Sequence, residues 1–124
     1  MKLGANTKAI VMARGFQEIY RAAASLGAWS DSFVKESAIL GDVLTTCISP
    51  DSRNRTTGQY LGEGKSVEEA KAMLKGRVCA GLETIQICRM FESLHHVRLP
   101  IMTALCDLAE GKIDRHQCLA QMLA

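Results

Sequence analysis

The sequence predicts a single all-α domain, residues 1–124, of about seven or eight helices. Three observations support this fold class. The chain has 124 residues, 48% hydrophobic and 23% charged, a balance typical of one globular domain with a sizeable core. Apolar residues recur at helical spacing along most of the chain. Capping residues and glycines separate these segments, and we find no convincing strand, internal repeat or linker.

The first expected helix runs from about Thr7 to Leu26, with Asn6 as its N-cap and Gly27 just beyond its end. Its apolar stripe, expected to face the core, contains Ala9, Ala13, Phe16, Tyr20 and Ala23. The opposite stripe, expected to face water, contains Arg14, Glu18, Arg21 and Ser25. Gly15 inside this helix costs about 1 kcal/mol relative to Ala. A close neighbouring backbone or ligand would explain this glycine, and a packing tolerance is the alternative.

Three short helices are expected next. Ser30 can cap a helix that reaches about Ser37. Asp42 is expected to open the following helix. Ser52 is expected to cap the third, which ends near Gly62 or Gly64.

The second half of the chain has clearer boundary signals. Ser66 and Glu69 form a capping box that starts a helix reaching about Leu74. Gly81 precedes a longer helix to about His96. The expected core face of that helix contains Leu82, Ile85, Ile87, Cys88, Phe91 and Leu94.

The last two expected helices are separated by a glycine. Pro100 suits the first turn of a helix that reaches about Glu110, where Gly111 stops it. Asp114 is expected to cap the final helix, which runs to about Leu123.

The charge balance argues against general nucleic-acid or membrane binding. The net charge is only +2, from 15 basic and 13 acidic residues. No apolar run approaches the roughly 20 residues that span a bilayer, and the first residues do not form a signal peptide. We therefore expect a cytoplasmic protein.

The cysteine pattern favours buried, reduced thiols. The five cysteines have no Cys-x-x-Cys spacing, and they are Cys47, Cys79, Cys88, Cys106 and Cys118. A zinc site from Cys88, His95 and His96 fits no familiar ligand spacing, so we expect no metal. The two histidines instead suit the C-terminal end of a helix dipole.

The segment 40–55 is the most informative candidate site. Asp42 and Thr46 are four residues apart, so a helix would place them on one face. A turn follows, and then Arg53 and Arg55 fall in the first turn of the next helix, where free N–H groups and the dipole favour an anion. This arrangement predicts a site for a small phosphorylated or carboxylated molecule.

The chain shows no nucleotide-binding motif. Residues 62–66 contain Gly-Lys-Ser, but they lack the first glycine at phosphate-loop spacing and a preceding strand. We interpret this segment as a helix–helix turn. The sequence therefore carries half of a site and no nucleotide-binding machinery.

Several short motifs, in a fixed order, resemble a known family over almost the whole chain. They are GANTKA at 4–9, RGFQE at 14–18, GDVLTTC at 41–47, SRNR at 52–55, GEGKS at 62–66, PI at 100–101 and EGK at 110–112. Together they resemble the C-terminal helical substrate domain of NAD(P)-dependent glycerol-3-phosphate dehydrogenase. The resemblance implies a fold like the C-terminal domain of six-phosphogluconate dehydrogenase relatives.

This resemblance implies an oxidoreductase that interconverts glycerol 3-phosphate and dihydroxyacetone phosphate with NAD or NADP. Asp42, the implied catalytic residue, and Thr46 would line the reacting end of the substrate. Arg53 and Asn54 would hold a phosphate of substrate or cofactor, because arginine offers a planar fork to phosphate oxygens. Arg53 and Val78 are the implied cofactor contacts. An Asp beside the substrate can accept a hydroxyl hydrogen bond and orient a catalytic lysine.

Two departures from the family shape these expectations. The family's nucleotide-binding domain and its catalytic lysine, in an Ala-Leu-Lys-Asn context, are not found in these 124 residues. We therefore expect a partner nucleotide-binding domain and no turnover by this chain alone. Ala80 also stands where many bacterial members have a cofactor-contacting Glu.

Two alternative functions stay open. The chain could be a degenerate helical module for binding or oligomerisation without catalysis, such as a homodimer formed through uncovered apolar surface. Retention of the Asp42, Thr46, Arg53 and Asn54 set argues against complete decay. It could also be a relative that acts on another small phosphorylated or hydroxyacid substrate, which the Ser-Arg-Asn-Arg context disfavours.

Overall fold

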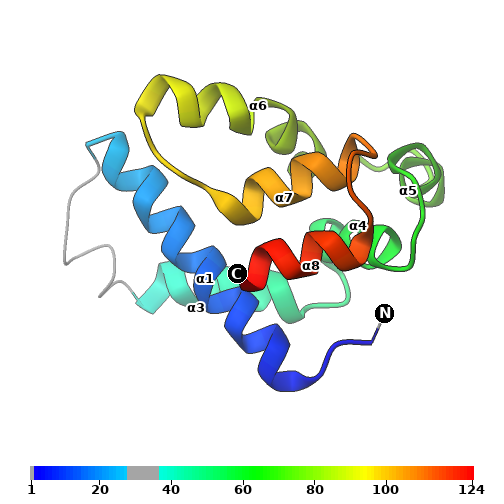
Figure 1. Ribbon diagram of the computed structural model, residues 1–124. Coiled ribbons are helices and arrows are strands. Elements are labelled where there is room, and N and C mark those ends of the chain that lie inside the picture. Colours follow the sequence, from blue (N-terminus) through cyan, green and yellow to red (C-terminus); the bar gives the residue numbers. More distant parts are fainter. Residues whose placement is uncertain (1, 28–36) are drawn as a thin grey trace.

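The computed structural model describes residues 2–27 and 37–124, and their helices confirm the all-α class. The helices, labelled as in Figure 1, are α1 Ala5–Ser25, α3 Ser37–Ile48, α4 Arg53–Gly62, α5 Val67–Met73, α6 Ala80–His95, α7 Pro100–Ala109 and α8 Arg115–Leu123. The short helix predicted for residues 30–37 lies outside the described residues except at its last position. None of the described helices is long and apolar enough to cross a membrane.

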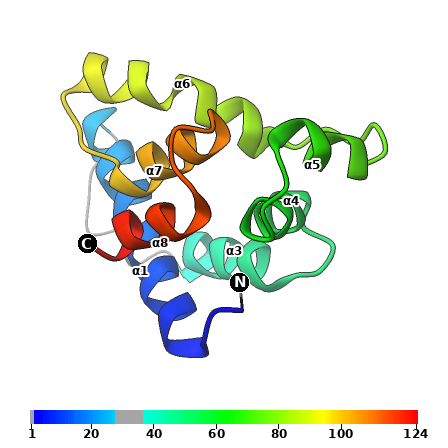
Figure 2. The ribbon, with the colours of Figure 1, turned by 45° about the vertical axis from the view of Figure 1, so that its right-hand side comes forward.

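The C-terminal helices form a stack. In both ribbon views α7 lies between α6 and α8 (Figures 1 and 2), and it packs on both of them. Helix α1 contacts α7, α8 and α3, whereas α4 contacts α3, α5 and α6. Helix α4 therefore packs between α3 and α6. The candidate site lies where α3 ends and where α4 and α6 begin.

Side-chain caps start three helices as the sequence predicts. Ser52 Oγ accepts the N–H of the third residue of α4 at 3.2 Å. Ser66 and Glu69 form the predicted capping box at α5. Asp114 and Gln117 form another at α8. These local signals are reliable because each cap satisfies N–H groups that the helix itself leaves unpaired.

Other boundaries differ slightly from the predictions. Asn6 is not a cap: α1 begins at Ala5, two residues earlier than predicted, with Gly4 as an extended N-cap. Alanine at this position is the best helix former. Gly81 does not precede its helix but is the second residue of α6. The segment 62–66 is a helix–helix turn as predicted, with Gly64 at φ 94°.

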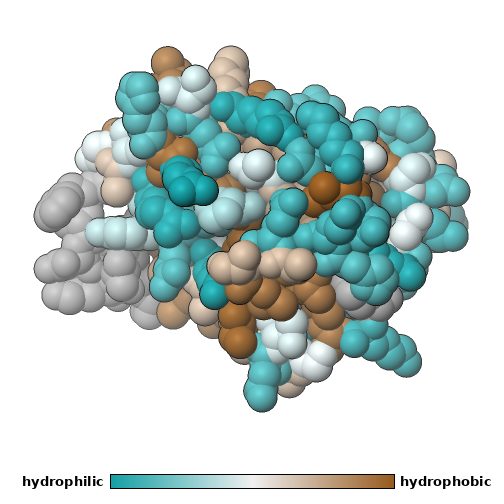
Figure 3. Space-filling model, in the orientation of Figure 1, coloured by the Kyte–Doolittle hydropathy of each residue, from teal (hydrophilic) through white to brown (hydrophobic). Residues whose placement is uncertain are grey.

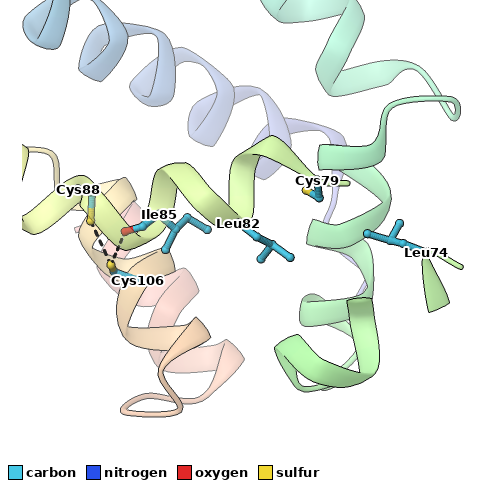
Figure 4. Close-up of a cluster of buried hydrophobic side chains, with 6 residues drawn as sticks. All are labelled: Leu74, Cys79, Leu82, Ile85, Cys88 and Cys106. Carbon is cyan, nitrogen blue, oxygen red and sulfur yellow. Dashed lines mark hydrogen bonds between the residues drawn. The ribbon is translucent and has the colours of Figure 1, made fainter. Parts of the chain in front are cut away.

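The buried face of α6 is narrower than the sequence suggests. Leu82, Ile85 and Cys88 are buried, and they belong to the core cluster of Figure 4 with Leu74, Cys79 and Cys106. Phe91 is half-buried. Ile87 and Leu94 were predicted in the core, but they are 52% and 71% exposed. They lie on the opposite face of the helix, so the predicted set merged two stripes.

The half-buried Glu92 continues the inner stripe of α6 beyond Cys88. Its carboxylate accepts the backbone N–H of Leu99 at 2.5 Å and the hydroxyl of Thr103 at 2.9 Å. A charged side chain holds this position because the start of α7, packed beside it, presents donors that need an acceptor.

The prediction for the two faces of α1 is only partly correct. Phe16, Tyr20 and Ala23 are half-buried and Arg21 is exposed, as expected. Glu18, expected to face water, is only 4% exposed, whereas Ala9 and Ala13 are exposed. The Glu18 carboxylate accepts the backbone N–H groups of Ile101 at 2.5 Å and Met102 at 3.2 Å. It thereby caps α7, whose own N-cap, a leucine, offers no side-chain acceptor.

Arg14 makes a complementary contact on the same face of α1. Its guanidinium donates to the backbone carbonyls of Met122 at 3.0 Å and Ala124 at 2.8 Å, at the C-terminal end of α8. The polar stripe of α1 therefore faces two helix termini of opposite partial charge, and each side chain carries the complementary charge.

The cysteines are free thiols, as expected. Cys47 is exposed and the other four are buried. Cys88 and Cys106 lie with their Sγ atoms 3.1 Å apart, and Cys106 donates to the Ile85 carbonyl at 2.8 Å (Figure 4). Burial, together with the neighbouring Cys106 thiol, raises the pKa of Cys88 to about 12.

Candidate functional site

A hollow of about 400 Å³ opens where α3 ends and where α4 and α6 begin. We call it the α3–α4–α6 hollow. Its lining residues are Thr45, Thr46, Ser49, Asp51, Ser52, Arg53, Asn54 and Ala80. The lining is rich in hydroxyl, amide and guanidinium groups. Two helix N-termini, those of α4 and α6, meet at it, so partial positive charge converges there.

Arg53 is the first residue of α4 and the guanidinium of the hollow. It is exposed, and it makes no ion pair with a carboxylate among residues 2–27 and 37–124. The preceding turn is fixed by the Ser52 N–H, which donates to the Ser49 carbonyl at 3.2 Å. A rigid turn therefore holds a guanidinium that can bind an anion through its fork of donors.

Asn54 joins the beginnings of α4 and α6. Its Oδ1 accepts the backbone N–H of Gly81 at 3.0 Å and the thiol of Cys79 at 3.0 Å. A Cβ at Gly81 would lie 2.9 Å from Oδ1, closer than real side chains approach. Glycine at this position therefore permits the contact that brings the two helix N-termini together.

Thr46 and Asp42 both lie on α3, one turn apart, so they share a face as expected. Thr46 lines the hollow, but Asp42 does not. The prediction that Asp42 opens a helix is wrong: α3 begins at Ser37, and Asp42 is its sixth residue. The apolar residues that precede Asp42 extend the helix toward the N-terminus, and a single capping residue did not mark that boundary.

Val78 lies in a different hollow. The α5–α6 hollow, of about 420 Å³, is lined by Lys71, Leu74, Gly76, Arg77, Val78, Cys79, Leu82, Glu83 and Gln86. Arg53 and Val78, the two predicted cofactor contacts, therefore do not share a hollow. Ala80, two residues after Val78 in sequence, lines the first hollow. Arg55 lines neither of the two hollows.

Sequence reasoning did not assign several residues of this region to the site. Asp51 lines the α3–α4–α6 hollow, and Cys79 and Gly81 hold Asn54 in place. Gly81 carried a usable signal, because glycine inside a helix costs about 1 kcal/mol and calls for a packing reason.

No cluster of three or more His, Cys, Asp or Glu side chains among the described residues could hold a metal ion. The His95 ring instead lies 4.5 Å from the ring of Phe91, one turn earlier on α6.

Comparison with known proteins identifies the family. Residues 1–120 match the family described as NAD-dependent glycerol-3-phosphate dehydrogenase C-terminus. The chain belongs to this family. It is 43% identical over 123 residues, 98% of its length, to the glycerol-3-phosphate dehydrogenase [NAD(P)+] of Corynebacterium diphtheriae. It is 40% identical over 111 residues, 90% of its length, to the enzyme of the same name from Zymomonas mobilis.

A solved structure supports the same membership. The fold matches that of glycerol-3-phosphate dehydrogenase from Coxiella burnetii with a TM-score of 0.87, at 28% identity and over 97% of this chain. The aligned part is only 35% of the Corynebacterium relative, 32% of the Zymomonas relative and 36% of the Coxiella chain. This C-terminal dehydrogenase domain therefore spans about a third of the length of the relatives it matches.

Proposed function

We propose that this domain is the substrate-binding part of an NAD(P)-dependent enzyme that interconverts glycerol 3-phosphate and dihydroxyacetone phosphate. The observation that carries the proposal is the α3–α4–α6 hollow. Within a domain of this family, it gathers Thr46, Arg53 and Asn54 at two helix N-termini.

The hollow suits a phosphate. Arg53 supplies a guanidinium fork, and the beginnings of α4 and α6 supply the positive ends of two helix dipoles. Thr46 lines the same space from α3 and can add a hydroxyl donor. Such a set of donors can bind a phosphate dianion.

Asp42 would act on the reacting end of the substrate. It is exposed on α3, one turn before Thr46 and outside the hollow that we assign to phosphate. A carboxylate at this distance along the helix, about 6 Å, can accept a hydrogen bond from a substrate hydroxyl and orient a lysine from the rest of the enzyme.

The nicotinamide, when bound, supplies or accepts the hydride. Among the described residues we assign only Arg53 and Val78 to cofactor contacts. The described residues contain no Gly-rich phosphate loop on a strand–helix turn. We therefore infer that a nucleotide-binding domain holds the cofactor and that the 124-residue chain alone does not turn over.

Exposed apolar side chains support such a partner domain. Figure 3 shows apolar atoms gathered over the part of the surface where α1 and α3 lie. On these two helices Ile10, Leu40, Leu44 and Ile48 are 38–66% exposed. The alternative, a module for self-association without catalysis, would use the same surface for a homodimer. We expect either form to be cytoplasmic.

A chimeric enzyme tests the proposal. Residues 1–124 would replace the matching segment of the Corynebacterium diphtheriae relative, and NADH oxidation with dihydroxyacetone phosphate would be followed. We expect activity in the chimera, and we expect Arg53→Ala to lower kcat/KM by about 100-fold, which corresponds to about 2.7 kcal/mol of transition-state stabilisation.

Two charge controls sharpen this test. Arg55→Ala removes the same charge two residues away, outside the hollow, and should lower kcat/KM by less than about 5-fold. Arg98→Ala, on an exposed segment outside both hollows, should leave it unchanged. A folded chimera without activity, or equal losses in all three variants, would favour the self-association module.

A further inference from the structure

We propose that Cys79 is a positioning residue for substrate binding: its thiol and the Gly81 N–H fix the Asn54 carboxamide so that Nδ2 donates to the phosphate. The inference rests on the proposed function, because it assigns a role to Asn54 at that site.

The hydrogen bonds decide which way the amide of Asn54 points. Oδ1 lies 3.0 Å from the backbone nitrogen of Gly81 and 3.0 Å from the Sγ of Cys79. The Gly81 N–H can only donate, so the atom facing it must be the oxygen. A flipped amide would set two NH groups against each other at that distance. With Oδ1 held by two donors, Nδ2 is the part of the amide left for a ligand.

Nδ2 makes no hydrogen bond within residues 2–27 and 37–124. Asn54 lines the α3–α4–α6 hollow. An anion in that hollow would supply the missing acceptor. Asn54 would then contribute its two N–H bonds alongside the guanidinium of Arg53.

Helix capping does not explain why a cysteine stands at position 79. Cys79 is the N-cap of α6, a position where Ser, Thr, Asp or Asn normally accepts an N–H, yet its side chain makes no capping hydrogen bond. The thiol, on a residue only 6% exposed, points to α4, where Asn54 Oδ1 lies 3.0 Å and the Arg53 carbonyl 4.0 Å from Sγ. Asn54 is the nearer acceptor. Packing in the core cluster is the simpler explanation, so the test must separate packing from hydrogen bonding.

The decisive variants are made in the chimeric enzyme described above. Cys79→Val keeps an apolar side chain of similar bulk but removes the donor, and Cys79→Ser keeps a donor. We expect Cys79→Val to raise the KM for dihydroxyacetone phosphate by about 5- to 10-fold with kcat changed less than about 2-fold. We expect Cys79→Ser to stay within about 2-fold of the parent in KM.

A purely structural role predicts a different pattern. The melting temperature would then fall most for Cys79→Ser, which buries a hydroxyl in an apolar cluster, and KM would be unchanged in both folded variants. A parental KM in Cys79→Val, or an equal rise in KM for both variants, would overturn the inference.

Asn54→Asp tests the orientation of the amide directly. A carboxylate is nearly isosteric and can still accept from Cys79 and Gly81, but it replaces the proposed donor with a negative charge facing the phosphate. We expect a melting temperature within about 3 °C of the parent and a KM raised by at least about 100-fold. A small change in KM would show that Nδ2 does not contact the phosphate.

The Arg53→Ala variant distinguishes a failure of the proposed function from a failure of the role inferred for Cys79. If Arg53→Ala leaves kcat/KM unchanged, the assignment of the hollow to phosphate fails, and the role of Cys79 fails with it. If Arg53→Ala is strongly impaired while Cys79→Val is not, only the role of Cys79 is rejected.

Discussion

Replacing Glu18 by alanine should strongly destabilise this domain, although the residue lies on what the sequence presents as a water-facing stripe. Glu18 is 4% exposed, and its carboxylate accepts two backbone N–H groups at the start of α7. A hydrogen bond to a charged group contributes about 1.5–3 kcal/mol, and its loss leaves a donor unpaired beside the core. We expect Glu18→Ala to lower the free energy of unfolding by roughly 3–5 kcal/mol.

This loss can be converted into a melting temperature. An unfolding entropy of about 2.1 cal/mol/K per residue gives roughly 0.26 kcal/mol/K for 124 residues. The expected loss therefore lowers the melting temperature by about 12–19 °C. Glu18→Gln keeps one carbonyl acceptor but loses the charge, so its melting temperature should lie about half-way between those of the parent and the alanine variant.

Urea unfolding followed by far-UV circular dichroism measures the difference. Gln17→Ala is the matched control, because Gln17 is the exposed neighbour on the same helix. Arg21→Ala is a second control. Its guanidinium is 3.9 Å from Glu18 and 46% exposed, so the pair contributes no more than about 1 kcal/mol. Hydrogen exchange at the Ile101 amide gives a local readout. The reasoning fails if Glu18→Ala unfolds within about 1 kcal/mol of Gln17→Ala and that amide stays protected.

Three further predictions follow from the same structure. Gly15→Ala should raise the free energy of unfolding by about 0.5–1 kcal/mol, because a Cβ there meets nothing within 4 Å, whereas Gly81→Ala should lower it by about 1–3 kcal/mol because its Cβ meets Asn54. If urea unfolding showed Gly15→Ala to be less stable than Gly81→Ala, the packing described at these two glycines would be contradicted. A thiol reagent at neutral pH should label Cys47 quickly and the four buried cysteines only after denaturation; rapid labelling of Cys88, whose pKa burial raises to about 12, would contradict its environment. Backbone N–H groups of the first turn of α8 lower the pKa of Asp114. The carboxylate therefore contributes fully to the free energy of unfolding above the ordinary carboxyl range, and this contribution is lost as pH falls through the lowered pKa. Asp114→Asn keeps the cap and should lose less stability than the parent between about pH 5 and about pH 2; identical acid profiles would argue against this cap as an acid-sensitive contact.

The features of the fold that could be predicted from sequence are those determined within one turn of chain. The caps at Ser52, Ser66 and Asp114 depend on neighbours three residues away, and all three are confirmed. The role of Glu18 depends on Ile101, 83 positions later, so no local pattern of α1 reveals it. The signal lies in α7 instead, because a helix that begins Leu-Pro has no cap of its own and needs an acceptor from elsewhere.

In the candidate site too, contacts between near neighbours in sequence could be predicted, and contacts between distant residues could not. Thr46, Arg53 and Asn54 flank one turn, and the structure brings them to one hollow. The boundary of α3 was misplaced because Asp42 is a good cap in isolation, while the segment before it already forms helix. The contact of Asn54 with Cys79 and Gly81 joins residues at least 25 positions apart, and only the packing of α4 on α6 creates it.

The two polar contacts of α1 also constrain how this domain is made. Arg14 and Glu18 find their partners 108 and 83 residues later, on α8 and α7. During synthesis the first helix therefore leaves the ribosome long before either partner exists, with a charged stripe and an apolar stripe both uncovered. Its docking closes the largest chain loops in the domain, which favours a late step in folding. A nascent chain arrested before α7 would expose α1 to chaperones or to other chains. The Glu18 contact can form once α7 has emerged, and the Arg14 contact only once α8 has emerged.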